Sequence, residues 1–141
     1  MATQRKSSKQ RPPAKRTSRG LQTGSRLTCI DNSGAKLCEI ISVIGYHGRR
    51  RRRNAATIGD MIQAAVKTGN PDIRNKMIRA IVVRQAMEYT RPEGIKVSFE
   101  DNACVQVTED GMPKGTEIKG TIGREAIERW PNIAKIASGV V

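Results

Sequence analysis

The sequence predicts a mainly β fold, a small closed or nearly closed β-barrel followed by two short helices. Three observations predict it. Six or so short apolar or β-branched runs are separated by turns rich in Gly, Asn and Asp at regular spacing. The spacing of apolar residues changes to a helical one after Arg124. The length of 141 residues suits one domain with a modest core.

The first half of the body supplies three strands. Leu27–Ile30 is a short strand, and the turn signal Asp31-Asn32-Ser33-Gly34 follows it. Leu37–Ile44 is nearly all apolar, so we expect this strand to be buried on both faces or to lie at a barrel seam. Met61–Val66 is the third strand, after a turn at residues 57–60.

A hairpin between residues 78 and 107 organises the second half. A β-branched run opens it, and Pro92 and Gly94 suit the second and fourth positions of a type I turn. On the return, Ile95, Val97 and Phe99 alternate with polar residues, the period of a half-buried strand. The hairpin reads either as an ordinary solvated turn or as a rigid arm that carries Arg84 and Arg91 outward.

The C-terminal region begins with a tight turn at residues 109–111 and a short strand around Ile118. A helix from Arg124 is expected to pair Glu125 with Arg129 and to end at Pro131. Asn132 is a good N-cap for a second short helix. Trp130 is expected to plug the core.

Charge separates the chain into two parts. Residues 1–20 contain seven of the 26 Lys and Arg residues and no acid, and they lack an apolar face, so we expect a disordered basic arm. Residues 21–141 form the single folded domain and keep 19 basic residues against 13 acidic ones. The net charge of +13 favours a polyanionic partner, of which nucleic acid fits best.

A membrane is the weaker alternative for these charges. The chain has neither an apolar stretch of about 20 residues nor a basic amphipathic helix. The N-terminus is basic but has no apolar segment of the kind that secretory signals contain. We therefore expect a cytoplasmic protein without a membrane partner.

Five consecutive arginines, Arg49, Arg50, Arg51, Arg52 and Arg53, form the strongest single feature of the sequence. Adjacent like charges repel one another and cannot be buried unpaired, whereas phosphate groups would stabilise them. Gly45 and Gly48 precede the run and would permit a close approach to RNA. The alternatives are a solvated charged loop and a localisation tag.

Other cations extend the predicted RNA-binding set beyond the run. In the body they are Lys36, Arg74, Lys76, Arg79, Arg84 and Arg91. In the arm we expect phosphate contacts from Arg5, Lys6, Arg11, Lys15, Arg16 and Arg19, the alternatives being a solvated tail and a targeting signal. Because aromatic residues make up only 3% of the chain, base stacking is not the expected mode. Shape and phosphate recognition of folded RNA remains.

The sequence offers no catalytic or cofactor site. Its one histidine, His47, lies beside the five arginines, and no nucleophile elbow or phosphate-binding loop is present. Cys29, Cys38 and Cys104 lack the closely spaced pairs typical of structural zinc sites. We expect them to be buried thiols in the core, without a metal and without a disulfide.

Several motifs resemble those of the universal large-subunit ribosomal protein family numbered fourteen, twenty-three in older eukaryotic naming. They include Asp31-Asn32-Ser33-Gly34-Ala35, Arg91-Pro92-Glu93-Gly94 and Phe99-Glu100-Asp101-Asn102-Ala103-Cys104-Val105. The resemblance covers roughly residues 21–141. The arginine run and Ile73-Arg74-Asn75-Lys76 are similar to archaeal or eukaryotic members, and the basic arm is longer than in bacterial members.

The resemblance implies a five-stranded β-barrel with a projecting hairpin and two short C-terminal helices. It also implies a structural, non-catalytic constituent of the large ribosomal subunit, which binds large-subunit rRNA and adjoins neighbouring ribosomal proteins. Members contact small-subunit rRNA in an intersubunit bridge, and anti-association factors dock on the same surface. That surface corresponds here to Thr116, Glu117, Lys119, Arg124 and Arg129.

Overall fold

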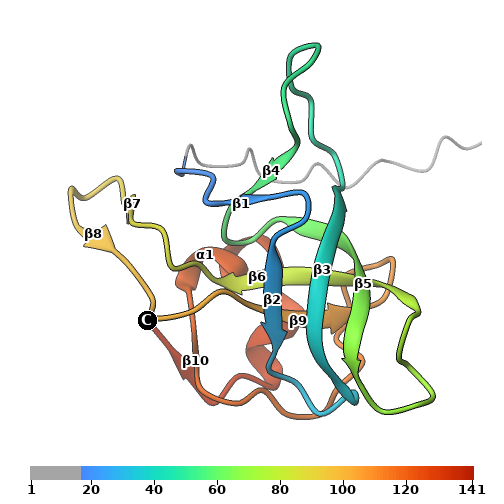
Figure 1. The fold of residues 1–141 in the computed structure, drawn as a ribbon. Helices are drawn as coiled ribbons and strands as arrows, with labels where there is room; N and C mark the ends of the chain where they lie inside the picture. Colours follow the sequence, from blue (N-terminus) through green and yellow to red (C-terminus); the bar gives the residue numbers. More distant parts are fainter. Residues whose placement is uncertain (1–16) are drawn as a thin grey trace, which may run out of the picture.

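Five strands close into a barrel in the structure, a computed structural model that describes residues 17–141. The strands lie in the order β2-β3-β5-β6-β9, and Figure 1 shows them wrapped around a common interior. Their bounds are β2 Arg26–Cys29, β3 Ala35–Val43, β5 Met61–Gly69, β6 Met77–Arg84 and β9 Ala103–Val107. The predicted five-stranded barrel is therefore confirmed.

Antiparallel pairing joins four of the five neighbouring strand pairs, and only β2 and β9 run parallel. The parallel pair closes the barrel and places Cys29 opposite Cys104. Long side chains fill the interior, because alternate residues of every strand point inward. Leu27, Ile40 and Val82 are among those buried there.

The burial of β3 rules out the first of its two expected arrangements, in which both faces are covered. Ile40 and Val43 are buried, but Ile41 between them is 44% exposed. A small barrel covers only the inner face of a strand unless other elements pack outside it. Its nearly continuous apolar sequence therefore does not mark a two-sided strand.

In the described part of the chain, three short two-stranded sheets lie outside the barrel. They are β1 Leu21–Gln22 with β4 Ala55–Ala56, β7 Tyr89–Thr90 with β8 Lys96–Val97, and β10 Thr121–Ile122 with β11 Gly139–Val140. The predicted turn at the hairpin tip is confirmed, because Gly94 N–H donates to the Arg91 carbonyl at 2.9 Å and Gly94 has a φ of +90°. The return strand is shorter than the alternation suggested, and Ile95 is 56% exposed.

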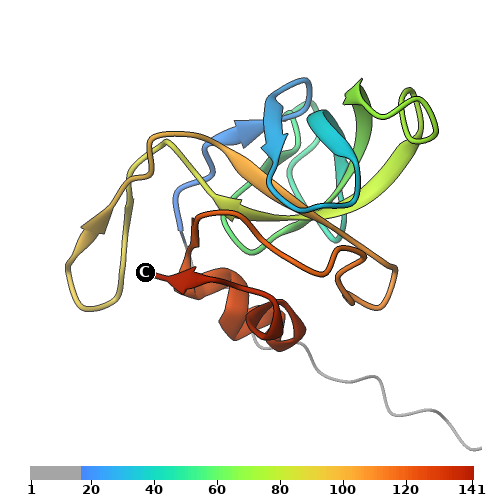
Figure 2. The same ribbon diagram turned by 90° about the horizontal axis from the view of Figure 1, so that it is seen from below.

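One helix and one 3-10 helix precede the last strand, β11. Helix α1 spans Arg124–Arg129, and the 3-10 helix η1 spans Pro131–Lys135, in which Asn132 lies inside rather than at the N-cap. Figure 2 shows this segment lying across one side of the barrel. Trp130 is buried, as expected, and its Nε1 donates to the Gly59 carbonyl at 2.8 Å.

The C-terminal segment forms a second core with the outer face of the barrel. Buried Ile81, Val105, Ile118 and Ile133 belong to this cluster, together with Trp130. No helix among residues 17–141 has the length and apolar character needed to cross a membrane. The fold thus leaves charged loops at the ends of the barrel and packs its apolar residues in two layers.

Candidate nucleic-acid interface

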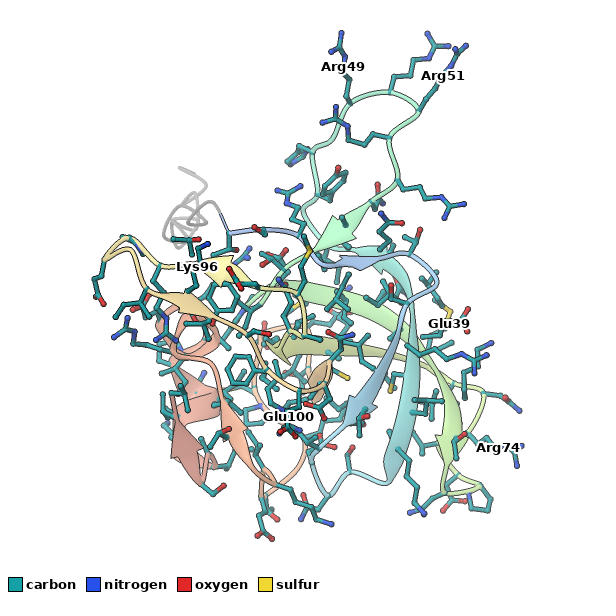
Figure 3. All side chains as sticks on the ribbon, turned by 60° about the vertical axis from the view of Figure 1, so that its left-hand side comes forward. Glu39, Arg49, Arg51, Arg74, Lys96 and Glu100 are labelled. Atoms are coloured by element: carbon teal, nitrogen blue, oxygen red, sulfur yellow. The ribbon has the colours of Figure 1, made fainter. Side chains whose placement is uncertain are left out.

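The arginine loop, residues 45–54, connects β3 to β4 and projects from one end of the barrel (Figures 1 and 3). Arg49 to Arg53 are all exposed, and Figure 3 shows Arg49 and Arg51 at the tip, away from the body. A backbone hydrogen bond from Arg52 N–H to the Arg49 carbonyl, at 3.0 Å, closes the turn. Arg51 has a φ of 68°, in the left-handed region.

Aromatic and glycine residues shape the stem of this loop. Tyr46 is partly buried against the barrel core, and the guanidinium carbon of Arg19 lies 4.8 Å from the centre of its ring. A side chain at Gly48 could not be accommodated without movement, because its Cβ would lie 2.2 Å from the Tyr46 ring. The stem is thus packed, whereas the charged tip is left to solvent.

No acid of the described part of the chain forms an ion pair with Arg49 to Arg53. Five guanidinium groups are therefore held side by side on a turn without internal compensation. Their mutual repulsion disfavours the arrangement in isolation, and a row of phosphates would relieve it. The geometry suits a polyanion that approaches this end of the barrel.

A second basic group lies at the opposite end of β3. Lys36 near the start of β3 and Arg74 and Lys76 in the β5–β6 loop are exposed. Pairing of Ala35 with Gly69 brings this loop beside the start of β3. Figure 3 shows Arg74 far from Arg49 and Arg51. We call Lys36, Arg74 and Lys76 the basic end.

Three predicted RNA-binding arginines form ion pairs within the protein instead of standing free. Arg79 lies 3.4 Å from Glu109, Arg84 lies 3.3 Å from Asp101, and Arg91 lies 2.7 Å from Glu125. Of the two interpretations of the hairpin, the rigid arm that carries Arg84 and Arg91 outward is wrong, because their side chains are only 17% and 9% exposed. Contact with RNA stays a prediction for all three.

Arg91, Tyr89 and Glu125 form what we call the hairpin anchor. Arg91 Nε donates to Glu125 Oε1 at 2.7 Å, and the Tyr89 hydroxyl donates to Glu125 Oε2 at 2.8 Å. Arg91 Nη2 also donates to the Val141 backbone oxygen at 2.8 Å. The anchor therefore ties the hairpin to α1 and to the C-terminal residues.

Burial and the ion pair set the protonation of the hairpin anchor. Burial would by itself raise the pKa of Glu125, but hydrogen bonds from Arg91 and Tyr89 outweigh it and hold that pKa below its ordinary value. Burial, with the Glu125 carboxylate beside it, raises the pKa of Tyr89 to about 12. The hydrogen bond to Glu125 raises the pKa of Arg91. The anchor stays a charged pair at neutral pH.

The residues expected at the intersubunit surface comprise four exposed ones and one half-buried one, Arg129. Thr116, Glu117, Lys119 and Arg124 are exposed. Thr116 exchanges two hydrogen bonds with Asn32, at 2.7 and 2.8 Å, and Arg124 pairs loosely with Glu93 and Glu128. Arg129 instead packs over Trp130 and pairs with Asp60, so the expected pair between Glu125 and Arg129 is wrong.

Residues 17–20 dock on the barrel, although the sequence placed them in the disordered arm. Thr17 Oγ1 lies 2.7 Å from Thr57 Oγ1, and the Ser18 carbonyl accepts hydrogen bonds from Thr57 and from Gln85. Gln85 is fully buried, and its role was missed because a single polar residue after a β-branched run carries no local signal. Arg5, Lys6, Arg11, Lys15 and Arg16 lie outside the described residues.

The three cysteines come together in the barrel core. Cys29, Cys38 and Cys104 are buried, as expected, and their Sγ atoms all lie within 4.8 Å of one another. Sequence spacing did not predict this cluster, because β2, β3 and β9 each supply one cysteine.

The comparisons with known proteins agree on one family. The family profile described as ribosomal protein L14p/L23e matches residues 20–141. The Large ribosomal subunit protein uL14 of Methanoregula boonei is 51% identical over 126 residues, covering 89% of this chain and 96% of the relative. The protein of the same name from Thermoplasma acidophilum is 52% identical over 128 residues, covering 91% and 97%.

Proposed function

Because the chain belongs to the ribosomal protein L14p/L23e family, we propose that it is a structural constituent of the large ribosomal subunit that binds rRNA. The observation that most strongly supports RNA binding is the arginine loop. Its five guanidinium groups are exposed, have no ion pair among the described residues, and lie on a packed stem. The protein has no catalytic role in this proposal. Its place of action is the ribosome in the cytoplasm.

The arginine loop and the basic end act at two separate places on the rRNA. The two groups lie near opposite ends of the nine-residue strand β3, about 26 Å apart at the usual rise per residue. At this separation the two groups contact different stretches of RNA backbone, which belong to two rRNA segments in this proposal. Three other arginines mainly stabilise the fold in this proposal, through their ion pairs: Arg79, Arg84 and Arg91.

The alternative is a free-standing architectural protein that binds duplex DNA through its basic arm. Sedimentation of a lysate through a gradient at moderate salt separates the two functions. A ribosomal constituent sediments with the large subunit and stays with it after nuclease removes DNA. A chain that sediments with nucleoid or chromatin, and is released by a DNA-specific nuclease, would contradict the proposal.

The surface formed by Thr116, Glu117, Lys119 and Arg124 faces the small subunit in this proposal and contributes to a bridge with its rRNA. All four residues are exposed, and Arg124 is the first residue of α1. The same exposed surface would receive an anti-association factor, because a factor that occupies it blocks subunit joining. Neighbouring large-subunit proteins are the other partners.

Charge reversal tests this orientation. We expect Lys119→Glu with Arg124→Glu to weaken subunit joining more than incorporation of the protein into the large subunit, because like charges would face the small-subunit phosphates. Light scattering of purified subunits measures joining, and gradient fractions measure incorporation. Lys135→Glu, an exposed change on η1, is the matched control. Normal joining with poor incorporation would show that the surface faces inward.

Residues 1–16 supply a further prediction. They carry six of the seven positive charges of the expected arm, so their removal lowers both rRNA affinity and its dependence on salt. The melting temperature stays nearly unchanged, because residues 17–20, which contact Thr57 and Gln85, are kept. Filter binding across a salt titration measures both quantities. Equal affinity and equal slope for the two proteins would favour a solvated tail.

A further inference from the structure

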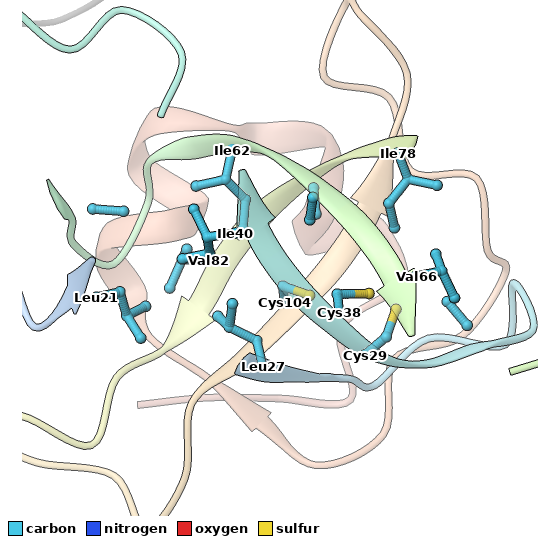
Figure 4. Close-up of a cluster of buried hydrophobic side chains, with 14 of the residues drawn as sticks. Leu21, Leu27, Cys29, Cys38, Ile40, Ile62, Val66, Ile78, Val82 and Cys104 are labelled. Carbon is cyan, nitrogen blue, oxygen red and sulfur yellow. The ribbon is translucent and has the colours of Figure 1, made fainter. Parts of the chain in front are cut away.

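The three-cysteine cluster has a geometry that simple core packing does not require. Sulfur atoms from three different strands converge within 4.8 Å of one another, and Figure 4 shows them grouped among aliphatic side chains. Cys29 and Cys104 are register partners on the parallel strands β2 and β9, and Cys38 reaches them from β3. The barrel thus holds three thiol groups in a triangle on rigid elements.

The surroundings of this triangle are dry and fixed. Leu27, Ile40 and Val66 belong to the same buried cluster, and Cys38 and Cys104 are fully buried. Only Cys29 retains 7% exposure, and its Sγ–H donates to Asp31 Oδ1 at 3.0 Å. Asp31 is itself held by Ser33 and by the Gln106 backbone N–H, so it orients Cys29. The position of the Cys29 thiol is therefore set by Asp31 and by the hydrogen bonds that hold Asp31.

We propose that Cys29, Cys38 and Cys104 form a three-coordinate site for a soft, thiophilic monovalent cation, Cu(I) being the type. Sulfur ligands select such ions over hard ones. With metal–sulfur bonds of about 2.3 Å, a planar three-sulfur site has sulfurs about 4.0 Å apart. The triangle therefore has to close by at most about 0.8 Å from its largest separation. Small rotations of the cysteine side chains would bring the three sulfurs to this spacing.

The same geometry disfavours zinc. A structural zinc ion takes four ligands in a tetrahedron, and only three metal-binding side chains converge here within the part of the chain that is described. Asp31 approaches only Cys29, and its two oxygens still accept hydrogen bonds from the Ser33 hydroxyl and the Gln106 N–H once Cys29 has lost its proton. His47 is exposed in the arginine loop. Each cysteine that binds Cu(I) as a thiolate releases one proton.

The test titrates the full-length, reduced protein with Cu(I) under anaerobic conditions, against a Cu(I)-specific chromogenic chelator. We expect the wild-type protein to withdraw one Cu(I) per chain. Cys38→Ala and Cys104→Ala each lower the Cu(I) affinity at least about 100-fold. This is more than is usually lost with a residue that only hydrogen-bonds to a metal ligand. Val66→Ala, which changes the same core and keeps the three thiols, is the matched control and retains the affinity within a few-fold.

X-ray absorption of the wild-type complex keeps the test independent of how the variants fold. The expected spectrum shows three sulfur ligands around one copper. Failure of the wild-type protein to compete with the chelator, unchanged affinity in both cysteine variants, or nitrogen and oxygen ligands in the spectrum would each overturn the proposal. Zn(II) offered alone should bind more weakly, and tighter binding of Zn(II) than of Cu(I) would contradict the three-coordinate assignment.

Discussion

Replacement of Arg49 to Arg53 by glutamine is expected to flatten the salt dependence of rRNA binding by about two to four units of log–log slope. The reason is counterion release, which contributes roughly 0.7 to 0.9 units for each phosphate that a cation neutralises. The five side chains are exposed and have no ion pairs among the described residues, so their loss removes charge without unfolding the barrel. The melting temperature should stay within error.

A charge-preserving variant is the control for this experiment. Five lysines in place of the five arginines keep the charge, so most of the slope should remain, while the loss of forked hydrogen bonds weakens binding at every salt concentration. Binding to the purified large-subunit rRNA is measured across a salt titration for the three proteins. If the glutamine protein kept the wild-type slope, the loop would be a solvated loop.

The second large effect concerns the hairpin anchor. Glu125→Ala is expected to lower the free energy of unfolding by about 2 kcal/mol, because it leaves Arg91 largely buried without its partner. The figure lies below the cost of breaking a fully buried pair, since the two side chains are still 9% and 12% exposed. Chemical denaturation followed by Trp130 fluorescence measures it.

An exposed ion pair of the same hairpin is the control. Glu88 and Lys96 lie 3.5 Å apart with exposures of 56% and 68%, so Glu88→Ala should cost less than about 0.5 kcal/mol. If Glu125→Ala cost no more than Glu88→Ala, the hairpin would be held elsewhere.

The anchor also predicts a dependence on pH. Because the pKa of Glu125 is lowered in the folded protein, the stability that it contributes is present above the ordinary carboxyl pKa and is lost as the pH falls through the lowered one.

Local signals in the sequence predicted local structure well. The turn at Pro92 and Gly94 follows from backbone geometry that these residues impose on their own neighbours, and the structure has it. The β-branched run before it likewise became β6. The exposed arginine loop could be predicted for a related reason, because five adjacent charges exclude burial whatever the fold.

Long-range partners could not be predicted in this way. Glu125 and Arg91 are 34 residues apart, and Arg129 and Asp60 are 69 apart, so no spacing rule links either pair. The helical period suggested that Glu125 pairs with Arg129, but Glu125 pairs with Arg91 and Arg129 pairs with Asp60. The meeting of the three cysteines has the same origin, because barrel closure decides which inward residues become neighbours.

A cryo-electron microscopy map of the large subunit that carries this protein tests the contact between the arginine loop and rRNA most directly. The account predicts that guanidinium groups of Arg49 to Arg53 lie at about 2.9 Å from rRNA phosphate oxygens, with the basic end at a second rRNA segment. A map in which the loop tip projects into solvent, with no phosphate near any of the five arginines, would contradict it.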